Sequence, residues 1–281
     1  MNRHPNISIV TPSFNQAAFL DDALLSVKHQ DYKCLEHIVI DGGSSDATTA
    51  ILKKYSSSQG WRHLQWVSEP DRGQSDALNK GFARARGEII GWLNSDDRYR
   101  ANCFMKVAKV FQDNPNVDIV YGDSTWMDLE GTVIRLRREI EFSYFILLYH
   151  RVLYIPTTST FFRRRIFDEG NLLDESLHYA MDFEFFVRLA SRGYRFNHLP
   201  SFLGDFRFQP DSKSSRMSHK QLEEVNEVMQ RYSPFSTQLQ GTALRNVGFT
   251  LLRSSAATLR YIRKFSRGYY LDRFRVTALR S

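Results

Sequence analysis

The sequence predicts an α/β fold: a mixed, largely parallel sheet flanked by helices, with a helical extension at the C-terminus. First, short β-branched runs alternate with segments of helical periodicity over the first 125 residues. Second, the connecting loops are short, which is typical of parallel strands joined by right-handed crossovers. Third, the net charge of +7 is unevenly distributed: residues 241–281 hold nine Arg or Lys and one Asp and so carry +8. This basic segment is therefore set apart from the main domain as an extension.

Five strands are predicted in the first half of the chain. They cover residues 7–11, 37–41, 63–68, 88–94 and 118–122. The helix after the first strand is indicated by apolar residues at i, i+3, i+4 and i+7 spacing, namely Leu20, Ala23, Leu24 and Val27. A second helix follows the GGSSD turn, with Ser45 or Asp46 as its N-cap. A third begins at Ser75.

The pattern changes after Asp123. Residues 124–138 read as a hairpin that turns at Glu130-Gly131, and a short helix is predicted from Ala180 to near Gly193. Residues 209–220 form a polar loop, and the rest is helical. We therefore divide the chain into a main domain, 1–218, with halves 1–123 and 124–218, and a basic helical extension, 219–281.

Composition excludes several classes of protein. Cys34 and Cys103 are the two cysteines, which is too few for a disulfide framework and fits a reducing cytoplasm. No signal peptide is visible, and the apolar segment 142–156 is too short to span a bilayer. A dehydrogenase is disfavoured because no G-x-G-x-x-G follows a strand. The basic tail seeks an anionic partner, and no nucleic-acid motif accompanies it. It is interpreted as a basic amphipathic helix on anionic lipid, or else as a charged helix that packs on the domain or a solvated, disordered end.

Polar residues stand at the ends of the predicted strands. Thr11, Asp41, Glu69 and the run Asn94–Asp97 could converge, since ligands of such sheets bind at the carboxyl ends of the strands. The adjacent carboxylates of Asp96 and Asp97 are costly to bury unless a cation such as Mg²⁺ or Mn²⁺ neutralises them. The alternative is a simple turn capped by Asn94 and Ser95.

Three further segments, and Asp182, have both a functional and a structural interpretation. The segments PSFN, 12–15, and VIDGGSSD, 39–46, suit a nucleotide, or else form a Gly-Gly turn with a helix cap. In the segment 69–88, Arg72 and Lys80 suit a diphosphate, or else form surface ion pairs. Asp182 shares a helix face with Phe185, Phe186 and Leu189, and is a general base or else a cap or a partner of Arg188.

Four motifs in this order resemble the family 2 glycosyltransferases with the GT-A fold, over roughly residues 5 to 215. The motifs are SIVTPSFNQAAFLDDALLSVKHQ, VIDGGSSDAT, EPDRGQSDALNKGFARARGEIIGWLNSDD and FDEGNLLDESLHYAMDFEFFVRL. The resemblance implies a nucleotide-binding, Rossmann-like sheet and a DxD-type metal motif. Asn94 stands where many members have the first Asp, Met181 precedes the catalytic position in place of an acid, and Gln209 replaces a common His.

The resemblance also assigns roles to residues. It implies that donor contacts come from Thr11, Pro12, Ser13, Asn15, Asp41, Arg72, Asp76, Asn94, Ser95 and Asp96. A divalent metal, Mn²⁺ or Mg²⁺, would be held by Asp97 first and Asp96 second. Asp182 would be the catalytic base.

The implied reaction is a single displacement. Asp182 takes the proton of an acceptor hydroxyl, and configuration at the sugar inverts. The expected partners are a nucleoside diphosphate sugar, with UDP favoured, and a glycan or lipid-linked acceptor. We expect a cytoplasmic protein with peripheral contact to the inner membrane face through residues 241–281. The alternative is a nucleotide-sugar-binding protein with weakened chemistry, which the departures at Asn94 and Met181 favour.

Overall fold

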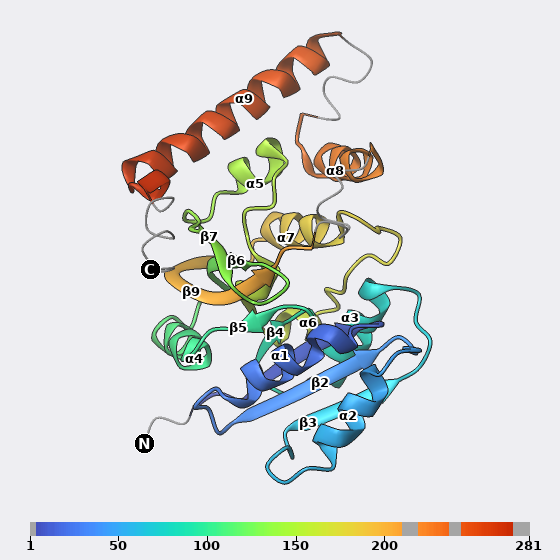
Figure 1. The fold of residues 1–281 in the computed structure, drawn as a ribbon. Helices are drawn as coiled ribbons and strands as arrows, with labels where there is room; N and C mark the ends of the chain where they lie inside the picture. Colours follow the sequence, from blue (N-terminus) through green and yellow to red (C-terminus); the bar gives the residue numbers. More distant parts are fainter. Residues whose placement is uncertain (1–3, 210–218, 236–242, 272–281) are drawn as a thin grey trace.

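The computed structural model describes residues 4–209, 219–235 and 243–271. One mixed sheet forms its centre, with helices on both faces, and the long helix α9 lies across one end of the molecule above α5 (Figure 1). The α/β fold predicted from strand and helix alternation is therefore confirmed.

Four parallel strands form the first part of the sheet, in the order β3-β2-β1-β4. Their bounds are β1 Ile7–Ser13, β2 Leu35–Asp41, β3 Leu64–Ser68 and β4 Ile89–Trp92. All four were predicted to within a few residues. Because they are parallel, their carboxyl ends lie along one edge of the sheet.

The second part of the sheet is mixed. Antiparallel β8 separates β4 from β6, β9 runs parallel to β6, and β5 and β7 pair with β9 and β6. The bounds are β5 Arg98–Tyr99, β6 Ile119–Met127, β7 Val133–Arg137, β8 Thr160–Arg163 and β9 Phe196–Arg207. The predicted hairpin exists as β6 and β7. Strands β8 and β9 were not predicted.

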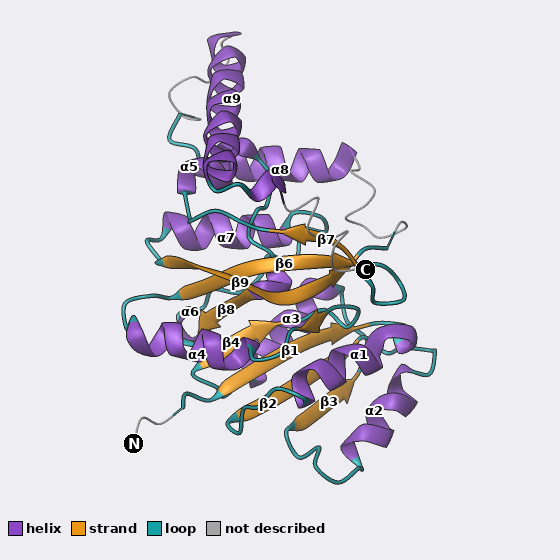
Figure 2. Cartoon of the chain, turned by 60° about the vertical axis from the view of Figure 1, so that its left-hand side comes forward, coloured by secondary structure: helices purple, strands orange, loops and turns teal. Residues whose placement is uncertain are grey.

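The helices cover the sheet in two layers (Figure 2). Helices α1, α2 and α4 pack on one face, and α3, α5 and α7 contribute to the core of the other. Their bounds are α1 Ala17–Lys28, α2 Thr48–Ser56, α3 Gln74–Arg84, α4 Cys103–Asp113, α5 Tyr144–His150 and α7 Met181–Ser191. The predicted apolar stripe of α1, from Leu20 to Val27, is fully buried.

Five shorter or peripheral elements complete the described chain. They are α6 Arg165–Asp168, α8 His219–Tyr232, α9 Ala243–Ser266 and two 3₁₀ turns, Thr157–Ser159 and Tyr269–Leu271. The polar loop predicted over 209–220 lies mainly outside the described residues, as does the end of the predicted extension. Within the described residues, no helix has the length and apolar character needed to cross a membrane.

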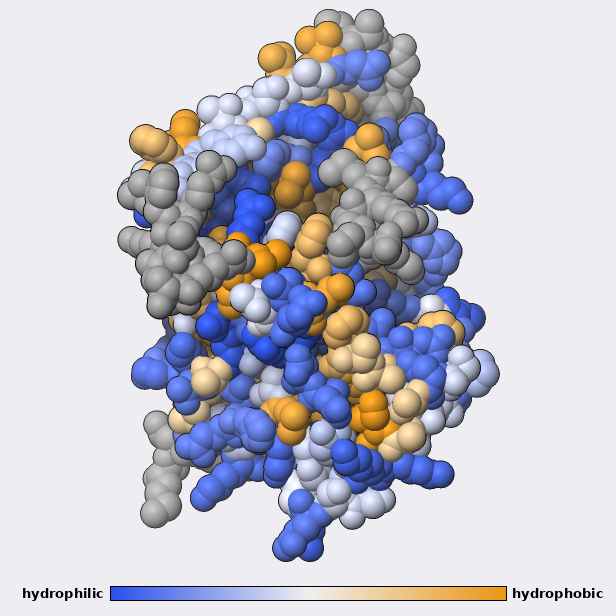
Figure 3. Space-filling model, in the orientation of Figure 1, coloured by the Kyte–Doolittle hydropathy of each residue, from blue (hydrophilic) through white to orange (hydrophobic). Residues whose placement is uncertain are grey.

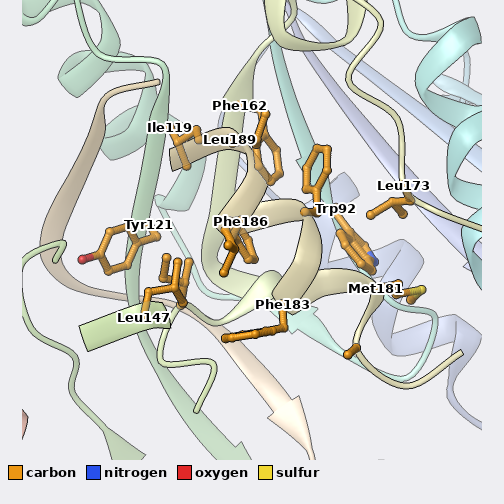
Figure 4. Close-up of a cluster of buried hydrophobic side chains, with 14 of the residues drawn as sticks. Trp92, Ile119, Tyr121, Leu147, Phe162, Leu173, Met181, Phe183, Phe186 and Leu189 are labelled. Carbon is orange, nitrogen blue, oxygen red and sulfur yellow. The ribbon is translucent and has the colours of Figure 1, made fainter. Parts of the chain in front are cut away.

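Helix α7 is anchored by aromatic packing. Phe185, Phe186 and Leu189 are fully buried, and Phe162 of β8 contacts both phenylalanine rings, with centroids 5.7 and 6.0 Å away. Figure 4 shows Phe162, Phe186 and Leu189 in this cluster, with Met181 near Trp92 at the start of the helix. The apolar face predicted for this helix is confirmed. It holds the N-terminus of α7, and with it Asp182, in a fixed place beside the sheet.

Candidate active site

The strand ends meet as the sequence predicts. The N–H of Gly42 donates to the carbonyl of Ser13 (2.8 Å), and that of Glu69 to the carbonyl of Asp41 (3.0 Å). Leu93 donates to Val10 (3.0 Å), so β4 leads into the same edge. One edge of the sheet therefore carries the loops after β1, β2, β3 and β4.

The first two loops are hydrogen-bonded to each other. Asn15 has a positive φ of 52°, its N–H donates to Ser44 Oγ (2.8 Å), and its Oδ1 accepts the N–H of Ser45 (2.9 Å). Asp46 Oδ2 accepts the N–H of Ala17 at the start of α1 (3.0 Å), and its Oδ1 accepts the N–H of Thr48 in α2. The Asp46 carboxylate therefore serves two helix starts.

Asp41 is buried and surrounded by donors. Its Oδ2 accepts the N–H of Ser44 (2.9 Å) and the hydroxyl of Ser68 (2.6 Å), and its Oδ1 accepts the hydroxyl of Ser44 (2.5 Å). The two oxygens of a carboxylate have the acceptor capacity for three such bonds. A nucleobase or ribose that bound here would share the Asp41 oxygens with Ser44 and Ser68.

Thr11, Pro12 and Ser13, the residues of β1 that were assigned to the donor site, are more buried than the loop residues that follow them. Thr11 is fully buried, and its hydroxyl is 2.9 Å from His37 Nε2. Burial lowers the pKa of His37 to about 3, so this imidazole is neutral at pH 7. Pro12 is also buried, whereas Ser13 Oγ is buried without a hydrogen-bond partner in the described part of the chain. Of the three, Ser13 is the one with an unused polar atom.

The start of α3 gathers charge. The N–H of Arg72 donates to Asp76 Oδ2 (3.0 Å), and its guanidinium lies 2.6 Å from Glu175 and 3.4 Å from Asp76. Lys80 is 3.3 Å from Asp76. The bond from the Arg72 N–H and the two cations lower the pKa of Asp76. The Arg72 side chain is 75% exposed, so its guanidinium can turn toward an anion without leaving a buried partner unpaired.

The Asn94–Asp97 segment is a turn with an ordered amide. Asp97 N–H donates to the carbonyl of Asn94 (3.1 Å). Asn94 Oδ1 accepts from Trp92 Nε1 and Gln74 Nε2, both at 2.9 Å, and its Nδ2 donates to Asp97 Oδ2 at 3.3 Å. An aspartate at position 94 would have no N–H to offer Asp97. The amide that Asn94 donates to Asp97 therefore explains why an asparagine fits position 94 of this chain.

Asp97 is enclosed by protein donors. It is fully buried, its Oδ2 also accepts Thr158 Oγ1 (2.5 Å), and its Oδ1 accepts the N–H of Arg207 (2.9 Å). Burial and the neighbouring charge of Asp96 raise its pKa well above the usual range. Its oxygens are therefore occupied by protein, not directed toward a ligand.

Asp96 is less enclosed. It is partly exposed, and its Oδ2 accepts Gln209 Nε2 at 2.7 Å. Burial raises its pKa. The buried guanidinium of Arg207 lies beneath the turn, donating to the Asp96 carbonyl (2.9 Å) and to Asp22 (2.6 Å). Of the adjacent pair, Asp96 has the greater capacity for a cation. In the described residues no group of three or more His, Cys, Asp or Glu forms a metal cage.

Asp182 lies at the first turn of α7 and is partly exposed. Its Oδ1 accepts the backbone N–H of Phe183 (2.7 Å), and no side chain among the described residues hydrogen-bonds it. Burial raises its pKa to about 6, although the charge of Arg137 acts in the opposite direction. Arg188 pairs with Glu184 instead (2.8 Å). A carboxyl group with this pKa changes its protonation state close to neutral pH.

Helix α3 connects Asp182 to the strand edge. Ser75 Oγ lies 2.8 Å from the sulfur of Met181, the neighbour of Asp182. Gln74, one residue earlier, reaches Asn94. The predicted donor loop, the turn before Asp96 and the predicted base therefore meet around the first turn of α3.

Three residues at this edge were not predicted. Gln74, Thr158 and Arg207 hold Asn94, Asp97 and the backbone of Asp96. Gln74 directly precedes Ser75, the predicted start of the helix, and this position is the one local signal that could have indicated its role. Thr158 lies in the 3₁₀ turn before β8 and Arg207 ends β9, and neither element was predicted.

Comparison with known proteins gives a consistent assignment. A family model described as "Glycosyl transferase family 2" matches residues 8–171. An uncharacterized glycosyltransferase of Mycobacterium tuberculosis is 32% identical over 192 residues, which is 68% of this chain and 71% of that protein.

Two groups of solved structures resemble the fold. S. aureus TarS 1-349 in complex with UDP-GlcNAc has a TM-score of 0.64 at 19% identity, covering 93% of this chain and 73% of that one. The chain covers 39% of the longer S. aureus TarS structure. The mannosyltransferase PcManGT from Pyrobaculum calidifontis, in complex with GDP-Man and Mn²⁺, has a TM-score of 0.58 at 18% identity, covering 98% and 86%.

Proposed function

The chain belongs to glycosyl transferase family 2, and we propose that it moves a hexosyl or N-acetylhexosaminyl unit from a nucleoside diphosphate sugar to an acceptor hydroxyl with inversion. Its fold is the GT-A glycosyltransferase fold. The acceptor that we propose is a glycan or a lipid-linked sugar of polysaccharide or glycolipid biosynthesis.

The observation that carries the proposal is the meeting of three groups at the start of α3. Arg72 is exposed beside Asp76, Gln74 holds the turn before Asp96, and Ser75 contacts the residue before Asp182. A diphosphate needs a cation, and an attacking hydroxyl needs a base. Both flank the first turn of α3: Arg72 precedes this turn, and Asp182 follows Met181, the residue that Ser75 contacts.

In the proposed reaction Asp182 removes the proton of the acceptor hydroxyl as that oxygen attacks the anomeric carbon. The bond to the diphosphate oxygen breaks as the new glycosidic bond forms, and one displacement inverts the configuration. Arg72 stabilises the charge that develops on the departing diphosphate. The loops of Ser13, Asn15 and Asp41 would hold the nucleoside.

The residues present fit a divalent cation held jointly with the donor. Asp96 offers oxygen capacity beyond its bond to Gln209, and burial raises its pKa, a cost that a cation offsets. Mg²⁺ and Mn²⁺ sites of this kind use one or two carboxylates plus substrate phosphates. When bound, the ion would neutralise charge on the leaving diphosphate.

We expect UDP-GlcNAc with Mn²⁺ to raise the melting temperature of the protein by about 5 to 10 °C at 100 times Kd, the shift that ligand linkage gives at this size. UDP should be favoured over GDP and dTDP, measured by thermal shift. Arg72→Ala should reduce the shift, whereas Arg84→Ala, an exposed arginine at the other end of α3, should not. The absence of a shift with any sugar nucleotide would contradict the proposed function.

The proposal includes peripheral contact with a membrane through α9. Its exposed face carries a stripe at helical spacing, made of Val247, Leu251, Tyr261, Ile262 and Phe265, each 55 to 77% exposed. An exposed apolar stripe on a helix within the basic C-terminal segment, residues 241–281, fits an anionic lipid surface.

Replacing Leu251, Ile262 and Phe265 with serine should weaken binding to vesicles of phosphatidylglycerol by on the order of 100-fold, because three large side chains no longer enter the bilayer. Co-sedimentation measures this. The matched control replaces two exposed apolar residues outside α9, Met105 and Leu222. Equal binding by all three proteins would refute the membrane contact.

A further inference from the structure

Two cations of α9, Arg260 and Lys264, do not lie on its exposed stripe. Leu252, Ala256 and Leu259 face the core, and Arg260 and Lys264 follow them on the side turned toward the domain. Their side chains are 13% and 16% exposed. Because they point inward, they cannot serve a membrane that contacts the opposite face. Their charge has to be matched by anions at the junction with the domain.

The end of helix α5 adds an imidazole and a guanidinium to the same junction. His150, at its end, is buried, and its ring lies 6.2 Å from Tyr261 of α9. Arg151 follows and donates to Asn226 of α8. We call the group of His150, Arg151, Arg253, Arg260 and Lys264 the α5–α9 seam. Figure 3 shows hydrophilic side chains gathered below α9 on this side of the molecule.

The acids present match only part of this charge. Glu139 is fully buried and accepts from Arg260 (3.1 Å) and Lys264 (3.0 Å), but also from Arg137 (2.7 Å). No carboxylate in the described part of the chain pairs with Arg151 or Arg253. Burial and the charges of Arg260, Arg253 and Lys264 lower the pKa of His150 to about 4, so these cations act on the same ring.

Three buried polar atoms in the seam lack partners among the described residues. They are Nε of Arg151, Nε of Arg260 and Nδ1 of His150. An unmatched buried N–H is costly and is normally satisfied by a ligand, a water or an ion. Two guanidinium groups with free N–H atoms are a good match for phosphate oxygens.

We propose that the α5–α9 seam is a binding site for a phosphate group, the phosphate or diphosphate of a lipid or lipid-linked acceptor. The inference rests on the proposed function and specifies its acceptor class. Arg137 connects the two sites, because it bonds Glu139 in the seam and its charge acts on Asp182. A phosphate in the seam would thus hold an acceptor whose sugar hydroxyl approaches Asp182, while the apolar stripe of α9 rests on the bilayer.

The test uses the full chain with its donor site saturated by UDP, so that inorganic pyrophosphate reports on a second site. Wild type should bind pyrophosphate saturably in calorimetry. R151Q/R253Q should weaken it by at least ~10-fold, as expected when two guanidinium contacts are lost. R62Q/R84Q removes two exposed arginines elsewhere and should bind like wild type. R253Q alone, at an exposed position, should give part of the loss without affecting folding.

The outcomes separate this inference from the proposed function. Absence of pyrophosphate binding beside bound UDP, or equal loss in R62Q/R84Q, overturns the seam site even if sugar transfer is observed. Failure to bind UDP while R151Q/R253Q still lowers pyrophosphate binding overturns the donor assignment and leaves the seam site standing. Phosphatidylglycerol vesicles, compared with phosphatidylcholine vesicles, then identify the source. Weaker binding of R151Q/R253Q to the former indicates a lipid headgroup; unchanged binding indicates the acceptor's own phosphate.

Discussion

Asp182→Asn is expected to lower kcat by about 10² to 10⁴-fold, the range in which a general base contributes to catalysis. The variant keeps the shape of the side chain, and Phe183 N–H can still donate to its oxygen. Donor KM should therefore change little. Transfer from UDP-GlcNAc to acceptor, followed by release of UDP, measures both constants.

The pH profile supplies the second measurement for Asp182. A base must be ionised to accept a proton, and burial raises its pKa to about 6. Wild-type kcat should thus rise as pH increases through about 6 and then level off. The rise should be absent from the residual activity of the asparagine variant. Asp168→Asn, which removes a carboxylate that is 58% exposed on α6, is the matched control and should keep the wild-type profile. Undiminished turnover in Asp182→Asn would eliminate the base assignment.

The position of Asp182 could be predicted because its signals are local. Its i+3, i+4 and i+7 neighbours are apolar, and the structure buries all three, Phe185, Phe186 and Leu189. Spacing alone placed the carboxylate on a packed face. The same holds for the strand ends at Asp41 and Asn94, since parallel strands bring their carboxyl ends to one edge whatever lies beyond them.

The second half of the sheet could not be predicted in this way. Strand β8 is four residues long and lies between β4 and β6, so its place depends on partners about 40 and 70 residues away. β9 was missed for a related reason: it contains polar residues and shifts register against β6. Arg207 at its end therefore gave no signal, although it supports the turn of Asp96 and Asp97.

Sequence spacing cannot decide which of the two adjacent aspartates, Asp96 or Asp97, is the metal ligand. The resemblance ranked Asp97 before Asp96 as the metal ligand. Adjacent residues in a turn face different surroundings, and only the tertiary partners decide which one faces the ligand. Thr158 and Arg207, 61 and 110 residues from Asp97, occupy both of its oxygens. We therefore favour Asp96 as the ligand, with Asp97 as the residue that keeps the turn in shape.

Because Asp96 and Asp97 are assigned different roles, their alanine variants should have opposite effects. Asp96→Ala should lower Mn²⁺-dependent kcat by about 10²-fold or more, the scale of losing one electrostatic contact to the leaving group. It should cost less than about 1 kcal/mol of stability, because the lost bond to Gln209 is at a partly exposed site. Asp97→Ala should behave in the opposite way and lose about 3 kcal/mol, since Asn94, Thr158 and the Arg207 N–H would be left without an acceptor.

Urea unfolding and Mn²⁺ titration of turnover separate the two roles. For Asp96→Ala we expect a normal midpoint and a weakened response to Mn²⁺; for Asp97→Ala, a lowered midpoint with the Mn²⁺ response retained in the folded fraction. The reverse pattern would make Asp97 the ligand, as the order of the motif suggests. Loss of the Mn²⁺ response in both, with normal stability in both, would mean that the pair binds the ion together. In that case the donors from Thr158 and Arg207 must release Asp97 when the donor sugar binds.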